Sequence, residues 1–276
     1  MTAPRLALIA GSGRFPLHVA REAKRQGIGV LALGIRGWAD PSLAGQVDAY
    51  EEIAVGELGR LIQRLKTDGI RQAIMAGKVT KEVLVSQRIS FDAEATKLLG
   101  GVRDFSVGAV LGAIGQRLAA EGITLLDSST FLKSSLCPEG VLTSRKPTGE
   151  ESEAIRIGMQ AARAIATLDI GQTVVVKGRV VVAVEALEGT DAAIRRAHAL
   201  AGPGLVVVKT ASPNHDRRFD LPVLGLETVT VFTECGVSCV AVEPGTTVLL
   251  DREALIDALN RARICLSGIS PDDPHS

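Results

Sequence analysis

The sequence predicts an α/β protein with two domains, an N-terminal Rossmann-like open sheet and a C-terminal mixed α/β domain. In the first half, short apolar segments alternate with segments of helical period, which is typical of parallel strands covered by helices on both faces. In the second half, two valine-rich segments flank Lys177-Gly178, which predicts a hairpin and hence antiparallel pairing. The chain is long enough to bury a core in each half.

The first domain is predicted over residues 1–137. Residues 6–10 read as an apolar strand, the turn Gly11-Ser12-Gly13 follows, and residues 17–26 have helical spacing. The pattern continues with a strand at 30–33, a helix at 58–65 and a strand at 73–76 that leads into Gly77-Lys78. A helix near 107–121 and a strand at 123–125 complete the predicted open sheet.

The second domain is predicted over residues 138–276. Prolines and glycines interrupt the pattern at 138–149, so this segment is expected to connect the domains, with Arg145 and Lys146 solvated. A helix at 150–168 precedes the hairpin strands, whose arms are apolar on both faces and are expected to be covered by helices. The remaining expected helices are 191–200, 227–235 and 252–261, and the remaining strands are 206–208, 239–242 and 248–250.

Composition argues against several functional classes. The 31 basic and 31 acidic side chains cancel, and there is one Trp and one Tyr, so neither a basic footprint nor stacking platforms for nucleic acid are expected. The four cysteines lack the paired spacing of a zinc site or a disulfide scaffold. Cys235 and Cys239 are expected to be small buried hydrophobic residues; the alternative is that they lie together on one face of a helix. With neither a signal peptide nor a membrane span at the N-terminus, a reduced, cytoplasmic protein is expected.

Two glycine turns are candidates for phosphate binding. Gly11-Ser12-Gly13 lies between a strand and a helix, where backbone N–H groups can approach a phosphate. It is half of a dinucleotide fingerprint, and a tight structural turn remains the alternative. Gly77-Lys78 ends another strand in the same way, and two loops at carboxyl ends of strands favour a crevice.

Acidic residues gather after the strand at 180–184. Glu185, Glu188 and Asp191 recur at every third position, although Thr190 or Asp191 could simply cap the following helix. Glu185 directly follows an apolar strand and should be partly buried, so a metal cation or Lys209 is needed to balance its charge.

A second acidic segment contains Asp216 and Asp220, which lie in an extended or looped stretch between two prolines. Carboxylates of this kind can hold Mg²⁺, and neighbouring cations can hold a phosphate. The alternative is a solvated turn in which Arg217 and Arg218 neutralise the acids.

These motifs, in this order, resemble the LpxI-type UDP-2,3-diacylglucosamine pyrophosphatases of bacterial lipid A synthesis. The resemblance spans most of the chain. It rests on Leu8-Ile9-Ala10-Gly11-Ser12-Gly13 with Pro16, Ala76-Gly77-Lys78-Val79, Ala183-Val184-Glu185 through Glu188-Gly189-Thr190-Asp191, and Arg218-Phe219-Asp220-Leu221-Pro222 with Gly225.

The resemblance implies an activity and its setting. Two α/β domains would hold an amphipathic UDP-sugar lipid, and Mg²⁺ or another divalent metal would direct water onto the α-phosphate. The products would be UMP and 2,3-diacylglucosamine 1-phosphate. It also implies a homodimer that works in the cytoplasm at the inner-membrane surface, with a peripheral contact there and a role in outer-membrane biogenesis.

Roles for individual residues follow from the resemblance together with the chemistry of each side chain. Asp220 is the best candidate for the essential acid. The predicted sets are Asp220, Asp191 and Glu188 for catalysis; Asp220, Asp216 and Asp191 for the metal; and Gly11, Ser12, Gly13, Gly77, Lys78, Thr190 and Lys209 for the substrate.

The chain also departs from the family pattern. Phe105-Ser106-Val107-Gly108 stands where the family carries Gly-Asp-Asp, and Asp104 is the nearby acid. Two alternatives therefore stay open: an NAD(P)-dependent oxidoreductase built on the Gly11 turn, and a non-catalytic homologue that binds a UDP-sugar or a lipid.

Overall fold

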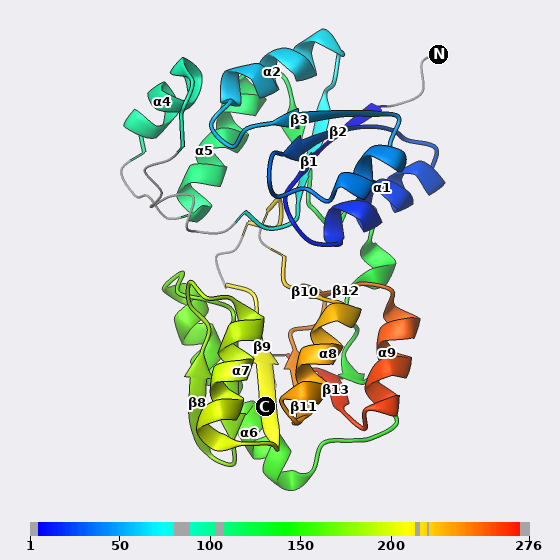
Figure 1. Cartoon of the computed structure of the whole chain (residues 1–276), viewed down its shortest axis with the longest axis vertical. Coiled ribbons are helices and arrows are strands. Elements are labelled where there is room, and N and C mark those ends of the chain that lie inside the picture. Colours follow the sequence, from blue (N-terminus) through cyan, green and yellow to red (C-terminus); the bar gives the residue numbers. More distant parts are fainter. Residues whose placement is uncertain (1–4, 80–88, 103–106, 213–215, 220, 271–276) are drawn as a thin grey trace. The chain divides into compact units, whose positions relative to one another are not determined.

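The structure is a computed structural model of the chain (Figure 1), and it describes residues 5–79, 89–102, 107–212, 216–219 and 221–270. The chain divides into two compact units. Unit 1 consists of Met1–Lys133 and Asp216–Asp220, and unit 2 consists of Ser134–His215 and Leu221–Ser276. A short piece of the C-terminal half therefore belongs to unit 1. A single domain boundary near residue 138 would assign that piece to the second domain.

Unit 1 contains a fully parallel sheet in the order β3-β2-β1-β4-β5. This is the strand order of a Rossmann-like domain, and it reverses between β1 and β4, where such sheets bind ligands. The strands are β1 (Arg5–Ala10), β2 (Gly29–Ile35), β3 (Ala49–Ile53), β4 (Gln72–Ala76) and β5 (Thr124–Leu125).

The helices of unit 1 pack their apolar faces against this sheet. In α2, the buried side chains Leu58, Leu61, Ile62 and Leu65 recur at helical spacing, so one face of the helix enters the core. The helices are α1 (Phe15–Arg25), α2 (Leu58–Thr67), α4 (Ala93–Gly100) and α5 (Val107–Ala120), and a 3₁₀ turn η1 covers Pro41–Gly45.

Two elements of unit 1 were not predicted. Strand β3 carries Tyr50, Glu51 and Glu52, so it lacks a continuous apolar run, and it lies at the edge of the sheet with one neighbour. Helix α4 has one buried residue, Ala95, so its periodic apolar signal is weak. Both elements depend on tertiary contacts more than on local pattern.

Unit 2 is built on a mixed sheet in the order β6-β13-β11-β9-β7-β8. The central strands β9, β11 and β13 are parallel, whereas β7, β8 and β6 pair antiparallel with their neighbours. The fold class predicted for both halves is thus confirmed. The strands are β6 (Gly140–Val141), β7 (Thr173–Lys177), β8 (Val180–Val184), β9 (Leu205–Lys209), β11 (Val237–Val242) and β13 (Cys265–Gly268), and β10 (Val223–Leu224) pairs separately with β12 (Val248–Leu249).

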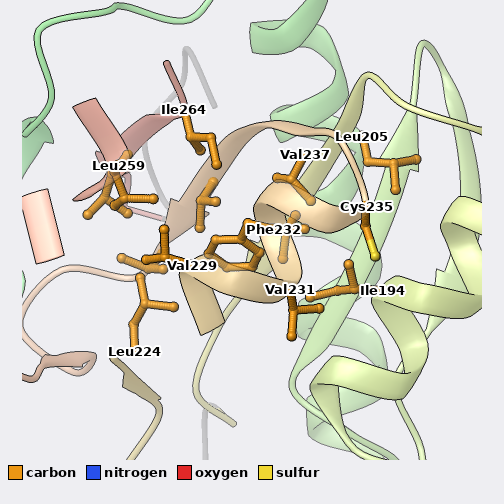
Figure 2. Close-up of a cluster of buried hydrophobic side chains, with 14 of the residues drawn as sticks. Ile194, Leu205, Leu224, Val229, Val231, Phe232, Cys235, Val237, Leu259 and Ile264 are labelled. Atoms are coloured by element: carbon orange, nitrogen blue, oxygen red, sulfur yellow. The ribbon is translucent and has the colours of Figure 1, made fainter. Parts of the chain in front are cut away.

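Helices cover both faces of this sheet. Helix α6 (Gly149–Thr167) packs on one face, and α7 (Thr190–Ala201), α8 (Leu226–Glu234) and α9 (Arg252–Arg261) pack on the other. Figure 2 shows the hydrophobic cluster on the face covered by α7, α8 and α9, with the Phe232 ring of α8 between Leu259 and Ile194. No helix in the described part of the chain is both long and apolar enough to cross a membrane.

The hairpin is confirmed, and helices cover both faces of its second arm as predicted, because β8 packs against α7 on one face and against α6 on the other. Strand β8 is at the edge of the sheet, and Val180 is 65% exposed. All four cysteines are buried free thiols, and the burial expected for Cys235 and Cys239 is confirmed. Cys235 ends α8 and Cys239 lies in β11, so they do not share a helix face.

The segment at 138–149 is an integral part of unit 2 and not a free connection. Its strand β6 pairs with β13. Arg145, expected to be solvated, donates two hydrogen bonds of 2.8 Å to Glu151 and others to the backbone oxygens of Ser238 and Arg263. Burial alone would raise the pKa of Glu151, but hydrogen bonds, mainly from Arg145, lower it from 4.5 to about 2.

Arg145→Ala should therefore destabilise the protein by about 2 kcal/mol at pH 7, because the Glu151 carboxylate and the carbonyl oxygens of Ser238 and Arg263 lose the hydrogen bonds that Arg145 donates. Since the folded pKa of Glu151 is depressed, its contribution is complete above pH 4.5 and is lost as the pH falls towards 2. The difference in unfolding free energy between wild type and Arg145→Ala should therefore become smaller as the pH falls from 4.5 towards 2. Urea unfolding at pH 7 and pH 3 measures both effects.

Lys146→Ala is the matched control, because Lys146 is exposed and should change the unfolding free energy by less than about 0.5 kcal/mol. Equal stability of the two variants would contradict the structural role of Arg145.

Candidate functional site

The two predicted glycine turns lie side by side at the carboxyl edge of the unit 1 sheet. They follow β1 and β4, the neighbouring strands between which the strand order reverses. Gly11 N donates to Ala76 O at 2.8 Å, Ser12 N donates to Lys78 O at 2.8 Å, and Lys78 N donates to Ser12 O at 3.0 Å. The structure thus brings together Gly11, Ser12, Gly13, Gly77 and Lys78, as the sequence predicts.

Glycine is required at two of these positions. A Cβ atom on Gly77 would lie 2.6 Å from Ser12 O, and the residue has a φ of +88°. A Cβ atom on Gly11 would lie 2.6 Å from Lys78 O. The turns approach each other so closely because neither has a side chain at these positions.

The N-terminus of α1 opens at the same edge. Arg14 is its N-cap, without a capping side-chain hydrogen bond to the described residues, and Pro16 occupies the first turn, where its missing N–H costs nothing. The first turn contains no acidic residue. The positive end of the helix dipole is therefore available to an anion, with the exposed Lys78 on the neighbouring turn.

A third element reaches this edge from much later in the sequence. Ser128, just after β5, places its Oγ 2.8 Å from Met75 O and 2.6 Å from Arg218 O, and its N–H donates to Arg217 O at 2.9 Å. Met75 is two residues before Gly77. The segment Asp216–Phe219 therefore lies at the same edge of unit 1 as the glycine turns.

The charges of this segment are paired. Arg218 Nε donates to Asp216 Oδ1 at 2.8 Å, so the neutralised-turn alternative is confirmed for Asp216. Arg217 Nε donates instead to Asp127 Oδ2 at 2.8 Å, and the other acid of the segment, Asp220, lies outside the described residues. Burial would raise the pKa of Asp127, but hydrogen bonds from Ser129 and Arg217 hold it below its ordinary value.

Asp127, Ser128 and Ser129 were missed by the sequence reasoning. The available signal was position, because this polar run follows the strand predicted at 123–125 and so falls at the carboxyl edge that carries the glycine turns. Nothing local, however, indicates that its partners are Arg217 and Arg218.

Unit 2 contains a buried polar cluster around Lys209, at the end of β9. Lys209 Nζ donates to Thr190 Oγ1 at 3.1 Å and to Thr173 Oγ1 at 3.2 Å, and it lies 4.0 Å from Glu185 Oε2. Thr190 Oγ1 donates to Glu185 Oε1 at 2.9 Å. The expectation that Glu185 is partly buried is confirmed, and of the two partners that the sequence left open, Lys209 is the one described, with the residues Glu185 and Lys209 9% and 6% exposed.

The alternative in which Thr190 or Asp191 caps α7 is wrong. The N-cap is Gly189, with a φ of +82°. Thr190 is the first residue of the helix, and its hydroxyl is used by Glu185 and Lys209. Asp191 lies on the exposed first turn, where its charge suits the helix dipole.

Glu188 is an exposed residue of the loop between β8 and α7. Its Oε1 accepts a hydrogen bond from Arg196 at 2.6 Å, and its Oε2 accepts one from Ala186 N at 3.1 Å. The hydrogen bond from Arg196 lowers its pKa. This carboxylate therefore stays ionised and braces the loop.

The predicted metal ligands do not form a described cluster. Asp216 belongs to unit 1, Asp191 belongs to unit 2, and Asp220 lies outside the described residues. Within the described ranges, no group of three His, Cys, Asp or Glu side chains could hold a metal ion. Asp216 is also engaged by Arg218, so the described donors do not by themselves fit Mg²⁺.

Gly77→Ala should lower the free energy of unfolding by about 2 to 4 kcal/mol, because it adds a steric overlap with Ser12 O to the strain of a positive φ. Gly27→Ala is the control, since Gly27 has a φ of +77° but open space around its Cβ position, and it should cost about 1 kcal/mol. Thermal and urea unfolding measure both. Equal losses would mean that the close approach of the turns is unimportant.

Lys209→Ala should cost roughly 3 kcal/mol of stability, because it leaves the buried Glu185 carboxylate without its cation. Arg179→Ala removes an exposed ion pair with Glu153, in which Arg179 is 75% exposed, and should cost less than about 1 kcal/mol. Urea unfolding of the two variants tests this contrast, and a similar small loss in both would contradict it.

Comparison with solved structures gives low similarity. A UDP-glucose-4-epimerase from Stenotrophomonas maltophila with bound NAD and formylated UDP-arabinopyranose matches 42% of this chain and 34% of its own, at 18% identity and a TM-score of 0.28. The biotin carboxylase domain of the Hydrogenobacter thermophilus 2-oxoglutarate carboxylase matches 65% of this chain and 36% of its own, at 14% identity and a TM-score of 0.28. This chain thus spans about a third of each, and such scores carry no argument about fold or function.

Sequence comparison is decisive. A curated relative from Caulobacter vibrioides, named UDP-2,3-diacylglucosamine pyrophosphatase LpxI, is 29% identical over 282 residues, which is 98% of this chain and 99% of the relative. The family model of the LpxI N-terminal domain matches residues 5–135, and that of the LpxI C-terminal domain matches residues 138–267. The chain therefore belongs to the LpxI family.

Proposed function

We propose that this protein is an enzyme that hydrolyses UDP-2,3-diacylglucosamine to UMP and 2,3-diacylglucosamine 1-phosphate in lipid A synthesis. The name of the Caulobacter vibrioides relative supports the substrate and the pyrophosphate bond. The observation that carries the proposal is the convergence at one edge of unit 1, where two glycine turns, the start of α1 and the segment Asp216–Phe219 meet.

The glycine turns suit the nucleotide end of such a substrate. Gly13 has a φ of +87° and open space where a Cβ atom would lie, so backbone can come close to a ligand at the point where the strand order reverses. The start of α1 and Lys78 supply positive charge for a diphosphate. Both features bind the nucleotide and hold its α-phosphate in place.

The Lys209 cluster suits a supporting role at the sugar phosphate. Because Lys209 is 6% exposed and bonds two threonines, its ammonium orients Thr190 at the start of α7. Thr190 and Asp191 then stand at the N-terminus of this helix, where backbone N–H groups favour a phosphate.

The chemical step is the attack of water on the α-phosphorus. The new bond joins the water oxygen to that phosphorus, the bond to the bridging oxygen breaks, and 2,3-diacylglucosamine 1-phosphate leaves. Positioning and charge neutralisation supply most of the rate enhancement in such transfers. We assign Asp220 the role of accepting a proton from the attacking water.

Mg²⁺ belongs to the proposal through the resemblance and through this chemistry, since a bound divalent cation would neutralise charge on the diphosphate. Asp220, Asp216 and Asp191 are the residues proposed to hold it. The described donors do not by themselves fit a metal site, since Arg218 engages Asp216. A homodimer in the cytoplasm, with a peripheral contact at the inner-membrane surface, belongs to the same proposal.

Two alternatives predict different ligands. The strand order of unit 1 would suit a dinucleotide-dependent oxidoreductase, but β2 leads into Arg36, where an acid would be needed for the ribose of NAD. A non-catalytic homologue would bind the UDP-sugar without turnover. The departure at Phe105 and Ser106 that favours it lies outside the described residues.

The test is to incubate the purified protein with UDP-2,3-diacylglucosamine and Mg²⁺ in ¹⁸O-water and to follow the products by mass spectrometry. We expect the label on UMP, because water attacks the α-phosphorus. Asp220→Ala should reduce turnover by at least about 10³-fold while the protein remains folded, because the water loses its proton acceptor.

Label on the lipid phosphate would move the attack to the β-phosphorus. Binding without products would identify a non-catalytic homologue, and tight binding of NADPH instead would support the oxidoreductase. Wild-type turnover in Asp220→Ala would contradict the catalytic role of Asp220. If EDTA has no effect on turnover, the proposed metal requirement is wrong.

A further inference from the structure

We propose that Asp127, Ser128 and Ser129 form a clasp that positions the segment Asp216–Phe219 for turnover, an inference that rests on the proposed hydrolysis. The clasp residues are thus positioning residues, and none of them is assigned a contact with substrate. They follow β5 in unit 1, and the segment they hold comes from much later in the chain.

Ser128 holds the backbone of the segment at two consecutive residues. Its N–H donates to Arg217 O at 2.9 Å, and its hydroxyl lies 2.6 Å from Arg218 O and 2.8 Å from Met75 O. The side chain is 1% exposed, so water does not replace these partners. The contacts fix the segment relative to the end of β4.

Asp127 holds the same segment through a side chain. Its Oδ2 accepts a hydrogen bond from Arg217 Nε at 2.8 Å. Its Oδ1 accepts hydrogen bonds from Ser129 N at 2.7 Å and from Ser129 Oγ at 2.6 Å. These bonds orient the carboxylate independently of Arg217. A pre-oriented acceptor holds the guanidinium in one place with less loss of side-chain entropy.

Two further contacts fix the remaining side chains. Phe219 packs against the hydrophobic core of unit 1. Arg218 lies against α5, where a Cβ atom on Gly115 would be 3.2 Å from Arg218 Nη1. All four residues of the segment are therefore held, directly or through Arg218, by unit 1.

The connectivity explains why such a clasp is needed. The chain that leads into the segment and the chain that leaves it both belong to unit 2. The backbone therefore tethers the segment to unit 2 at each end, and its register on unit 1 depends on non-covalent contacts alone. Asp220, the proposed proton acceptor, is the next residue in the sequence, and a displacement of about 1 Å of a catalytic group can cost about 10²-fold in rate.

The first experiment compares Ser128→Ala with wild type in the hydrolysis assay. We expect kcat to fall at least about 10-fold while KM stays within about 3-fold, because the nucleotide-binding turns are unchanged. Amide exchange of Arg217–Phe219 should rise at least about 10-fold without substrate. Ser267→Ala is the matched control, since this serine is also 1% exposed but lies in β13, and kcat and exchange should stay within about 2-fold of wild type.

A second experiment uses Asp127→Ala, Arg217→Ala and the double variant. If the pair acts as one positioning contact, the double variant should lose no more kcat than the worse single variant, within about 3-fold. A loss that multiplies across the two sites would mean that they act separately, which would overturn the clasp.

The outcomes separate this inference from the proposed function. An inactive wild type would overturn the proposed function, and the positioning role with it. An active wild type with unchanged kcat in Ser128→Ala would overturn the inference alone, whether or not amide exchange rises. Equal losses of kcat in Ser128→Ala and Ser267→Ala would mean that Ser128 has only a general structural role. That result would also overturn the inference.

Discussion

The hydrogen bonds between the Gly11-Ser12 turn and the Gly77-Lys78 turn are the constraint on which the candidate site of unit 1 depends. They join the ends of β1 and β4 at the reversal of strand order and leave the start of α1 open. The overlap that a Cβ atom would make on either side keeps both positions as glycine. The segment Asp216–Phe219, from later in the chain, lies at the same edge.

The two units use buried polar contacts in similar ways. In unit 1, Ser128 and Asp127 hold Arg217 and the backbone that follows it. In unit 2, Lys209 and Glu185 hold Thr190 at the start of α7. In unit 2 the Lys209 and Glu185 charges are buried and balanced by each other and by hydroxyl groups, whereas in unit 1 the buried group is Ser128 and the Asp127–Arg217 pair is 36% and 40% exposed.

The acidic segment changes how the domain organisation relates to function. A division into two consecutive domains assigns Asp216 and its neighbours to the C-terminal half. The structure gives Asp216–Asp220 to unit 1, so this unit contains residues from both halves of the sequence. The contacts of Arg217 and Phe219 within unit 1 therefore hold the residues that precede Asp220 in the sequence.

The sequence by itself determined the α/β class, most helices and strands, the two glycine turns and the need for a cation beside Glu185. These follow from local periodicity, from glycine geometry and from the cost of an unpaired buried charge. Tertiary structure alone decided the edge strand β3, the role of Arg145, the use of the Thr190 hydroxyl and the union of Asp127 with Arg217. These partners are set by the packing of distant segments, and 90 residues separate Asp127 from Arg217. No local sequence pattern predicts such a contact, because the two residues interact only when the folded chain has brought them together.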